Sequence, residues 1–159
     1  MAYDARSVAN ELLRIAISAG RRLTNMQVQK LVYIAHGYSL AILREPLIKQ
    51  MVQAWRYGPV VPDLYHALRK HGSGVVTEPI NILSREKLSE TDRVLLTNVE
   101  KAYARFTGPQ LSTMTHREGT PWRQVYDPKA EFNNDVIPND LIQQHYLTLL
   151  NERAGIIPE

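Results

Sequence analysis

The sequence contains no cysteine. This absence excludes disulfides and thiolate chemistry, and it removes the usual ligands of zinc-finger sites. Long hydrophobic runs are also missing, because no apolar stretch approaches the roughly 20 residues that a membrane-spanning helix needs. The N-terminal residues "MAYDARSVANELL" lack the basic start, apolar centre and small-residue cleavage site of a signal peptide. We therefore expect a cytoplasmic protein that does not enter a membrane.

Recognisable catalytic motifs are missing as well. None of the five histidines belongs to an H-E-x-x-H motif, "GSG" at residues 72–74 lacks the lysine of a phosphate-binding loop, and there is no G-x-S-x-G nucleophile elbow. His36 lies in an apolar segment and is interpreted as a hydrogen-bonded core histidine. We predict that the protein is not an enzyme and binds neither a metal nor a cofactor. For an enzyme acting on a small molecule, the first residues to test would be His116, Arg117 and Glu118.

The length and the charge distribution limit the organisation and the partners. A chain of 159 residues suits one domain, which we place at residues 1–159. The formal net charge is +3, but residues 1–85 hold 11 basic and 5 acidic residues, whereas residues 86–159 hold 8 basic and 11 acidic residues. This asymmetry has two interpretations, an acidic protein or nucleic-acid partner and a chance distribution, and the basic residues occur only singly or in pairs.

A helix-turn-helix is the DNA-binding motif that the sequence comes closest to. Residues 20–22 offer a turn between two helices, but the second helix carries core residues where base-reading side chains should stand. Its polar cluster is limited to Gln27, Gln29 and Lys30. Direct nucleic-acid binding is therefore not expected, and a DNA-binding regulator is kept as an alternative function.

Two helices are predicted in the first quarter of the chain. Asp4 can cap the first helix, and Gly20 follows its end. Its apolar stripe consists of Val8, Leu12, Ile15, Ala16 and Ala19. Thr24 and Gln27 form a capping box at the start of the second helix, residues 25–43.

The second helix has an unusually wide apolar surface. Its main face consists of Leu31, Ile34, Ala35, Tyr38, Ala41 and Ile42, and Val32 and Leu40 widen it. Such a helix is usually central and covered on more than one side. Gly37 lowers helix propensity by about 1 kcal/mol relative to alanine, which indicates close approach of a neighbouring element.

The pattern changes between residues 46 and 57. A weak alternation predicts one or two short strands, which we expect to form a small β-hairpin. Gly58-Pro59 then predicts a rigid turn, and Pro62 suits the first position of a helix that ends near residues 71–72.

Further helices are predicted at residues 89–106, 110–117, 122–126 and 138–150. The inward residues of the first of these are expected to be Val94, Leu95, Val99, Ala102, Tyr103 and Phe106. Residues 127–138 are expected to be a polar connection. The predicted fold is mainly α, a single compact helical domain of about six helices with a small β element near residues 46–57.

Two stretches combine aromatic residues with arginine, proline and glycine: "WRYGPVVP" and "LSTMTHREGTPWRQVY". Aromatic and arginine side chains dominate binding hot spots. Alternatively, Trp55, Tyr57 and Trp122 are core residues that attach loops to helices, and we favour this role for the two tryptophans. The candidate partner-binding residues are Arg56, Tyr57, Gly58, Pro59, Val60, Tyr65, His116 and Arg117.

Three segments carry a resemblance to a known family. "QKLVYIAHGYSLA", "QAWRYGPVVPDLYHAL" and "LSTMTHREGTPWRQVY", in this order and at this spacing, resemble the Panacea antitoxin domain, the SocA-like family of bacteria and their phages. The similarity covers nearly the whole chain. "AWRYGPVVP" and "THREGTPW" are its most specific parts.

The resemblance implies a compact helical domain with a β-hairpin, and an antitoxin that neutralises a toxin encoded beside it by direct protein–protein contact. One branch of the family is an adaptor that delivers its toxin to an AAA+ protease, so a proteolytic adaptor is the main alternative function. Some members carry an extra DNA-binding domain, which we do not expect here because the domain fills the chain. The family motif carries no established catalytic residues.

Overall fold

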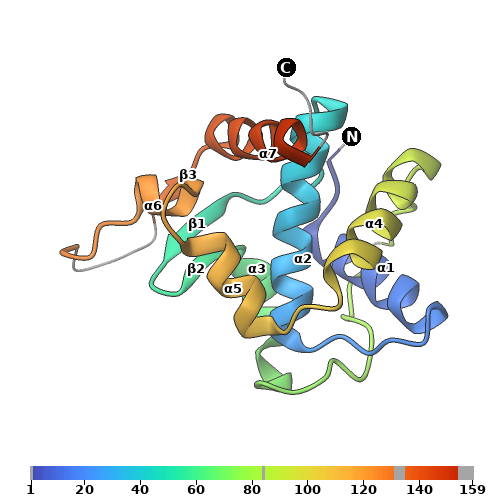
Figure 1. Ribbon diagram of the computed structural model, residues 1–159. Helices are drawn as coiled ribbons and strands as arrows, with labels where there is room; N and C mark the ends of the chain where they lie inside the picture. The colour runs from blue at the N-terminus through green and yellow to red at the C-terminus, as the bar shows by residue number, and fades with distance from the viewer. Residues whose placement is uncertain (1, 84, 131–134, 154–159) are drawn as a thin grey trace.

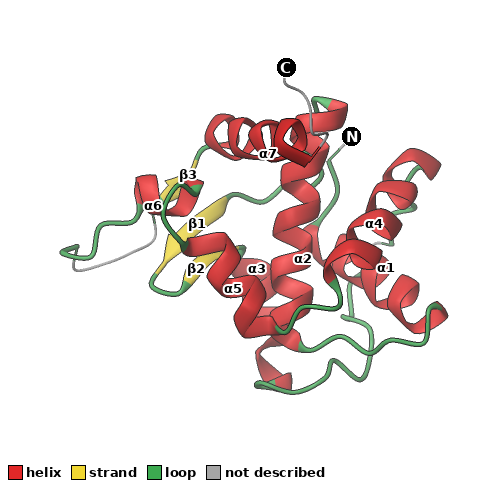
Figure 2. Ribbon diagram, in the orientation of Figure 1, coloured by secondary structure: helices red, strands yellow, loops and turns green. Residues whose placement is uncertain are grey.

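The computed structural model describes residues 2–83, 85–130 and 135–153 (Figure 1). Over these residues the chain forms seven α-helices and a small antiparallel sheet, which confirms the predicted mainly α fold (Figure 2). The helices are α1 (Ala5–Ser18), α2 (Asn25–Tyr38), α3 (Pro62–Leu68), α4 (Glu90–Tyr103), α5 (Gly108–His116), α6 (Pro121–Val125) and α7 (Asn139–Arg153). In this part of the chain, no helix combines the length and the hydrophobicity needed to cross a membrane.

α2 is the central helix, as its apolar surface predicts. α1 and α4 lie on one side of it, α5 lies on the other, and α7 crosses its C-terminal half (Figure 1). Leu31, Ile34, Ala35 and Tyr38 are each no more than 5% exposed. The expected capping box is present, since the Thr24 hydroxyl accepts the Gln27 amide and the Gln27 side chain accepts the Thr24 amide.

The ends of the first two helices differ in detail from the prediction. α1 ends at Ser18, so Ala19 becomes an exposed cap residue rather than part of the apolar stripe, and Gly20 takes a φ of +78°. α2 continues into a π-helical turn, Ser39–Leu43. Ile42 was expected to face inward but is 51% exposed, because the wider π turn rotates it away from the buried face.

His36 is a core residue, as predicted. Its side chain is 1% exposed. Its Nε2 atom is 3.0 Å from Asn139 Oδ1, and its Nδ1 atom accepts the Leu47 amide at 3.2 Å. One ring therefore connects α2 to the start of α7 and to the segment that leads into the sheet.

The sheet contains three short strands, β1 (Val52–Trp55), β2 (Gly58–Val60) and β3 (Val136–Ile137), in the order β2-β1-β3. The predicted hairpin is present, but its turn is Arg56-Tyr57, and Gly58-Pro59 belongs to β2. Pro59 is tolerated because β2 is an edge strand. Residues 131–134 of the predicted polar connection 127–138 lie outside the described residues. The prediction is wrong at Val136–Ile137, where β3 pairs with β1; a two-residue strand has too little alternation to be detected.

The inward face of α4 also differs from the prediction. Val94 is 49% exposed and Ala102 is exposed, whereas Leu96 is buried and Glu100 is 1% exposed. The Glu100 carboxylate accepts hydrogen bonds from Nε and Nη2 of Arg21, at 2.7 and 2.5 Å. Val99 and Tyr103 are buried as predicted, and Leu95 and Phe106 pack against the core, so the prediction is wrong at Val94 and Ala102 and lacks Leu96 and Glu100.

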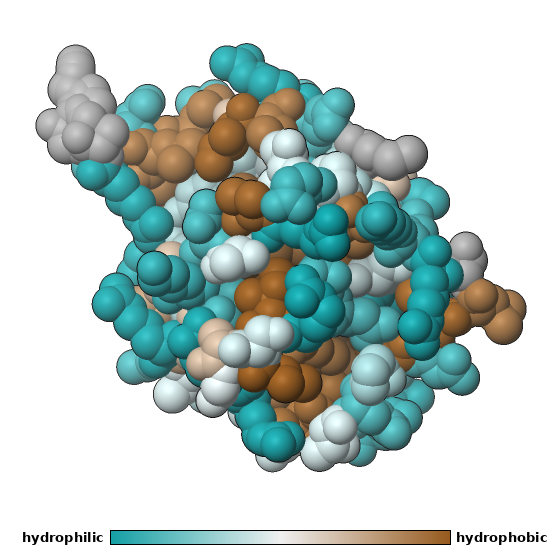
Figure 3. All heavy atoms as spheres, turned by 90° about the vertical axis from the view of Figure 1, so that its right-hand side faces the viewer, coloured by the Kyte–Doolittle hydropathy of each residue, from teal (hydrophilic) through white to brown (hydrophobic). Residues whose placement is uncertain are grey.

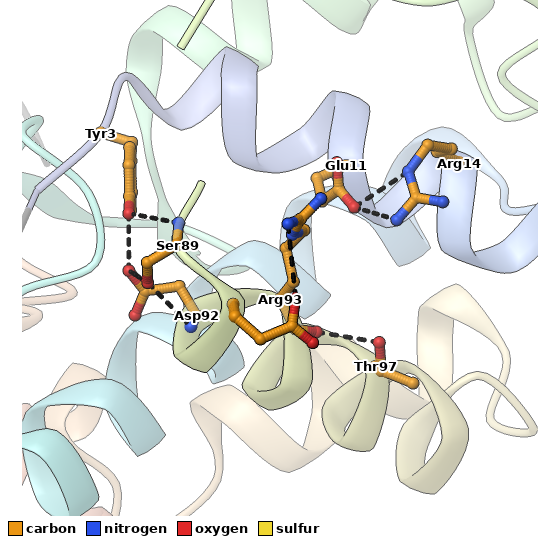
Figure 4. A network of polar contacts seen from close by, with 8 residues as sticks. Tyr3, Glu11, Arg14, Ser89, Asp92, Arg93 and Thr97 are labelled. Atoms are coloured by element: carbon orange, nitrogen blue, oxygen red, sulfur yellow. Dashed lines mark hydrogen bonds and ion pairs between the residues drawn. The ribbon is translucent and has the colours of Figure 1, made fainter. Parts of the chain in front are cut away.

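A network of polar contacts fixes the start of α4 against the first residues of the chain (Figure 4). Tyr3 Oη donates to Asp92 Oδ2 at 2.7 Å, and Ser89 Oγ donates to the same oxygen at 2.9 Å. The Ser89 amide in turn donates to Tyr3 Oη, and Ser89 caps the helix by accepting the Asp92 amide. A buried phenol thus holds together two segments that are far apart in sequence.

The close approach predicted at Gly37 is present. A Cβ atom at this position would lie 2.2 Å from Cδ2 of the Tyr146 ring on α7. The Tyr146 ring also packs edge-on against Tyr33 and Tyr38 of α2, with centroid separations of 6.2 and 4.8 Å. Glycine therefore sets the distance between α2 and α7.

We expect Gly37→Ala to lower the free energy of unfolding by about 1–3 kcal/mol, the usual cost of overpacking, despite the roughly 1 kcal/mol higher helix propensity of alanine. Chemical denaturation measures this change. In a Tyr146→Ala background the opposing ring is absent, so the same substitution should cost less or stabilise. An equal loss in both backgrounds would contradict the steric explanation.

Candidate functional site

The two unusual sequence stretches meet in the structure. α5 packs against β2, and the Ser112 hydroxyl on α5 donates to the Tyr57 carbonyl of the hairpin turn at 2.9 Å. Trp122 on α6 donates from Nε1 to the Trp55 carbonyl at 2.5 Å. The hairpin is therefore held from one side by two helices that lie far along the chain.

The hairpin turn presents its side chains to solvent. Tyr57 is 69% exposed, and Arg56 is exposed with its guanidinium carbon 5.3 Å from the centre of the Tyr57 ring. Gly58 and Pro59 are buried behind them, and Val60 is half-buried. A rigid frame thus carries an exposed aromatic–arginine pair, the residue types that dominate binding hot spots.

A groove of about 640 Å³ lies beside this turn. Four segments line it: the start of α2, the hairpin, residues 72–73 after α3, and the start of α5. Its apolar walls come from Met26, Trp55, Tyr57, Val60 and Pro109, and its charged residues are Lys30 and Arg56. We call this space the hairpin groove.

Lys30 is a buried cation in the hairpin groove. Its side chain is 5% exposed, and its Nζ atom donates to the Pro59 carbonyl at 2.9 Å. Among the described residues, no carboxylate pairs with it. Burial disfavours the charged form and lowers the pKa of Lys30 from 10.5 to about 8. The ammonium ion is therefore still the main form at neutral pH.

Gly58 makes room for this lysine. Its φ of +127° is a conformation that other residues rarely adopt, and a Cβ atom there would lie 3.2 Å from Lys30 Nζ. The same Cβ would be 3.6 Å from Cβ of His116 on α5. Glycine at this position therefore permits both the hairpin geometry and the close packing of α2, β2 and α5.

The remaining predicted residues lie around the groove rather than in it. The Tyr65 ring packs edge-on against Trp55 at 5.0 Å between centroids. His116 is half-buried, hydrogen-bonded through Nδ1 to the Ser112 carbonyl, and its ring packs edge-on against Trp122 at 5.3 Å. These contacts indicate supporting roles for Tyr65 and His116. Trp122 is a core residue, as predicted, being 6% exposed.

Arg117 opens onto a different space, a cleft of about 440 Å³ between α4, α5 and α7. Lys101, Arg105 and Arg153 line the same cleft, so it is strongly basic. Burial and the positive charge of Arg117 lower the pKa of His145, which also lines it. The sequence prediction thus placed Arg117 with the hairpin residues, whereas the structure separates the two.

A third hollow, of about 270 Å³, lies between α1 and residues 76–79. Figure 3 shows the side of the molecule on which α1 and α4 lie, where apolar atoms are visible in separate patches between hydrophilic side chains. Ile17 of α1, 63% exposed, lines this hollow. The hollow is smaller than the hairpin groove.

Within the residues that the structure describes, no group of three or more histidine and carboxylate side chains could hold a metal ion. Glu118 forms an ion pair with Arg123 at 2.9 Å on the surface, rather than a constellation with His116.

Comparisons with known proteins identify the family. Residues 28–123 match the family model "Antitoxin SocA-like, Panacea domain". The chain belongs to this family, which confirms the resemblance stated from the sequence. The matched range contains Lys30, the hairpin and α5.

A relative of established name supports the same assignment. Antitoxin SocA of Caulobacter vibrioides (strain NA1000 / CB15N) is 33% identical over 133 residues, which cover 75% of this chain and 68% of that protein. No solved structure gives a significant match.

Sequence reasoning missed part of the groove. Lys30 enters the sequence analysis only as part of the polar cluster of the second helix, and Met26, Pro109 and Ser112 are not among the candidate residues. One signal was present, since Lys30 stands next to Leu31 on a helix that is apolar over most of its surface. A lysine in such a position either reaches solvent at the edge of the apolar surface or is buried because its ammonium has a structural or functional role.

Replacement of Lys30 by methionine should reveal the buried charge. In the native protein, the cost of burying the ammonium is fully present below pH 8 and disappears as pH rises to 10.5. The native protein should therefore gain about 3 kcal/mol of unfolding free energy relative to Lys30→Met between pH 7 and pH 10.5. Urea denaturation across this range measures the difference. Lys101→Met, at an exposed lysine, is the matched control and should show no comparable change.

Proposed function

We propose that this protein is an antitoxin that neutralises its cognate toxin by direct protein–protein contact through the hairpin turn and the hairpin groove. Membership of the SocA-like antitoxin family supports the antitoxin role. The observation that carries the choice of surface is the exposed Arg56-Tyr57 pair at the edge of a largely apolar groove. The partner is the toxin encoded next to this protein.

The frame of this surface suits a binding protein. Three hairpin carbonyls accept a hydrogen bond from a helical side chain. These bonds run from Trp122 to Trp55, from Ser112 to Tyr57 and from Lys30 to Pro59. A turn held in this way loses little conformational entropy when a partner binds. The candidate residues then divide into contact residues on the turn and supporting residues beneath it.

Co-expression tests the proposed function as a whole. The product of the adjacent gene should stop growth when expressed alone, and this protein should restore growth and co-purify with it. A harmless neighbouring product would overturn the proposal. The toxin's half-life distinguishes masking from delivery to an AAA+ protease, since masking leaves the half-life unchanged or longer and delivery shortens it.

Substitutions in the hairpin should separate binding from folding. Arg56→Ala and Tyr57→Ala remove exposed side chains, so they should leave the melting temperature within a few degrees and weaken toxin binding by about 1 kcal/mol or more. Pro59→Ala should act mainly on stability, because Pro59 is buried and restricts the unfolded chain. Thermal melting and titration calorimetry on the same preparations give both quantities.

His116→Ala provides a further comparison for these variants. His116 supports Trp122 beneath the hairpin, so its loss should lower stability and affinity together. Full-strength toxin binding by both Arg56→Ala and Tyr57→Ala would exclude the hairpin turn as the contact surface.

A further inference from the structure

Lys30 has more hydrogen-bonding capacity than the structure uses. An ammonium group has three donors, and Nζ makes one hydrogen bond among the described residues, to the Pro59 carbonyl. The side chain is 5% exposed and lines the hairpin groove. A buried charge normally has a counter-charge, because leaving it alone is costly.

Attachment of α2 to β2 does not by itself explain a lysine here. A nearby carbonyl of the same hairpin, that of Tyr57 in the turn, accepts a hydrogen bond from the neutral hydroxyl of Ser112 at 2.9 Å. A neutral donor satisfies a carbonyl without the cost of burying a full charge. The hydrogen bond to the Pro59 carbonyl therefore does not require the positive charge of Lys30.

The charged side chains that line the hairpin groove are all positive. The described residues that line it include two cations, Lys30 and Arg56, and no carboxylate. The rest of the lining is apolar or uncharged, with Met26, Trp55 and Pro109 among the walls. A complementary occupant is therefore mainly apolar and carries negative charge at the point that meets Lys30.

We propose that the hairpin groove receives an aspartate or glutamate side chain carried by an apolar segment of the toxin, and that its carboxylate pairs with Lys30. This inference rests on the proposed function. Lys30 donates its unused N–H groups to the carboxylate, Arg56 stands at the edge as a second cation, and the flanking apolar side chains cover Met26 and Trp55. The occupant is assigned to a side chain rather than to a chain end, and amidation of the toxin's C-terminus distinguishes the two.

The arrangement makes the antitoxin selective. A partner that places an apolar side chain against Lys30 leaves the ammonium buried without a counter-charge, and a basic partner adds repulsion. An acidic group relieves the existing cost of the buried charge. The same lysine therefore attracts one class of toxin segment and discriminates against others.

The test compares Lys30→Met with Lys101→Met for binding to the purified toxin. Lys30→Met should weaken binding about 30-fold or more, because it leaves a toxin carboxylate buried without a partner. Lys101→Met applies the same substitution at an exposed lysine outside the groove and should have little effect. Circular dichroism and melting curves confirm that both variants fold.

Two further measurements identify the pairing group. Each toxin aspartate or glutamate is changed to asparagine or glutamine, and the pairing residue is the one whose effect is strongly non-additive with Lys30→Met. NMR titration of the Lys30 ammonium, assigned by its absence in Lys30→Met, should show a higher pKa in the complex than in the free protein. Docking of an apolar group would lower that pKa instead.

The outcomes separate this inference from the proposed function. Absence of toxin binding by the native protein overturns both. Native binding with an unaffected Lys30→Met, or a lowered Lys30 pKa in the complex, overturns the inference alone and leaves the antitoxin role. Additive effects at every acidic side chain, together with weaker binding of a toxin amidated at its C-terminus, would assign the carboxylate to the chain end and overturn the side-chain assignment.

Discussion

The need to cover α2 on all sides is the constraint on which the rest of the structure depends. Its residues from Val28 to Tyr38 are buried with few interruptions, and α1, α4, α5, α7 and the hairpin each take part of its surface. No single helix can enclose another, so elements from both ends of the chain must converge on it. Gly37 allows α7 to reach the backbone of α2, and His36 attaches the start of α7 to the approach to the sheet.

The hairpin groove follows from this arrangement. α5 and β2 both pack on α2, and β2 is an edge strand whose outward carbonyls need partners. Lys30 of α2 donates to the Pro59 carbonyl of β2, and Ser112 of α5 donates to the Tyr57 carbonyl in the adjoining turn, so both helices hold the hairpin. The groove is the space left where the start of α2, the start of α5 and the hairpin turn diverge. The proposed binding surface thus shares residues with the packing of the fold, and burial of the Lys30 ammonium lowers the stability of the free protein.

The hairpin groove and the basic cleft draw their positive charges from different halves of the sequence. The excess of positive charge in residues 1–85 includes Lys30 and Arg56 of the groove. The cations of the cleft, Lys101, Arg105, Arg117 and Arg153, come instead from the acidic half of the chain. The net charge of a sequence segment therefore does not predict the charge of a surface region, because the fold brings together like charges from distant positions.

The sequence by itself determined the helical elements, the N-caps of α1 and α2, the central position of α2, the core role of His36 and the family. These features depend on local spacing and capping chemistry, or on motifs that are contiguous in the chain. Only the tertiary structure decided the hairpin turn at Arg56-Tyr57, the pairing of β3 with β1 and the inward position of Glu100, since each depends on a partner far away in sequence. It also decided which candidate residues lie together: Arg56, Tyr57 and Val60 line one groove, while Arg117 lines a separate cleft. Lys30 could be located in the groove only from the fold, because burial of a charge depends on what surrounds it in space and leaves no pattern of its own in the sequence.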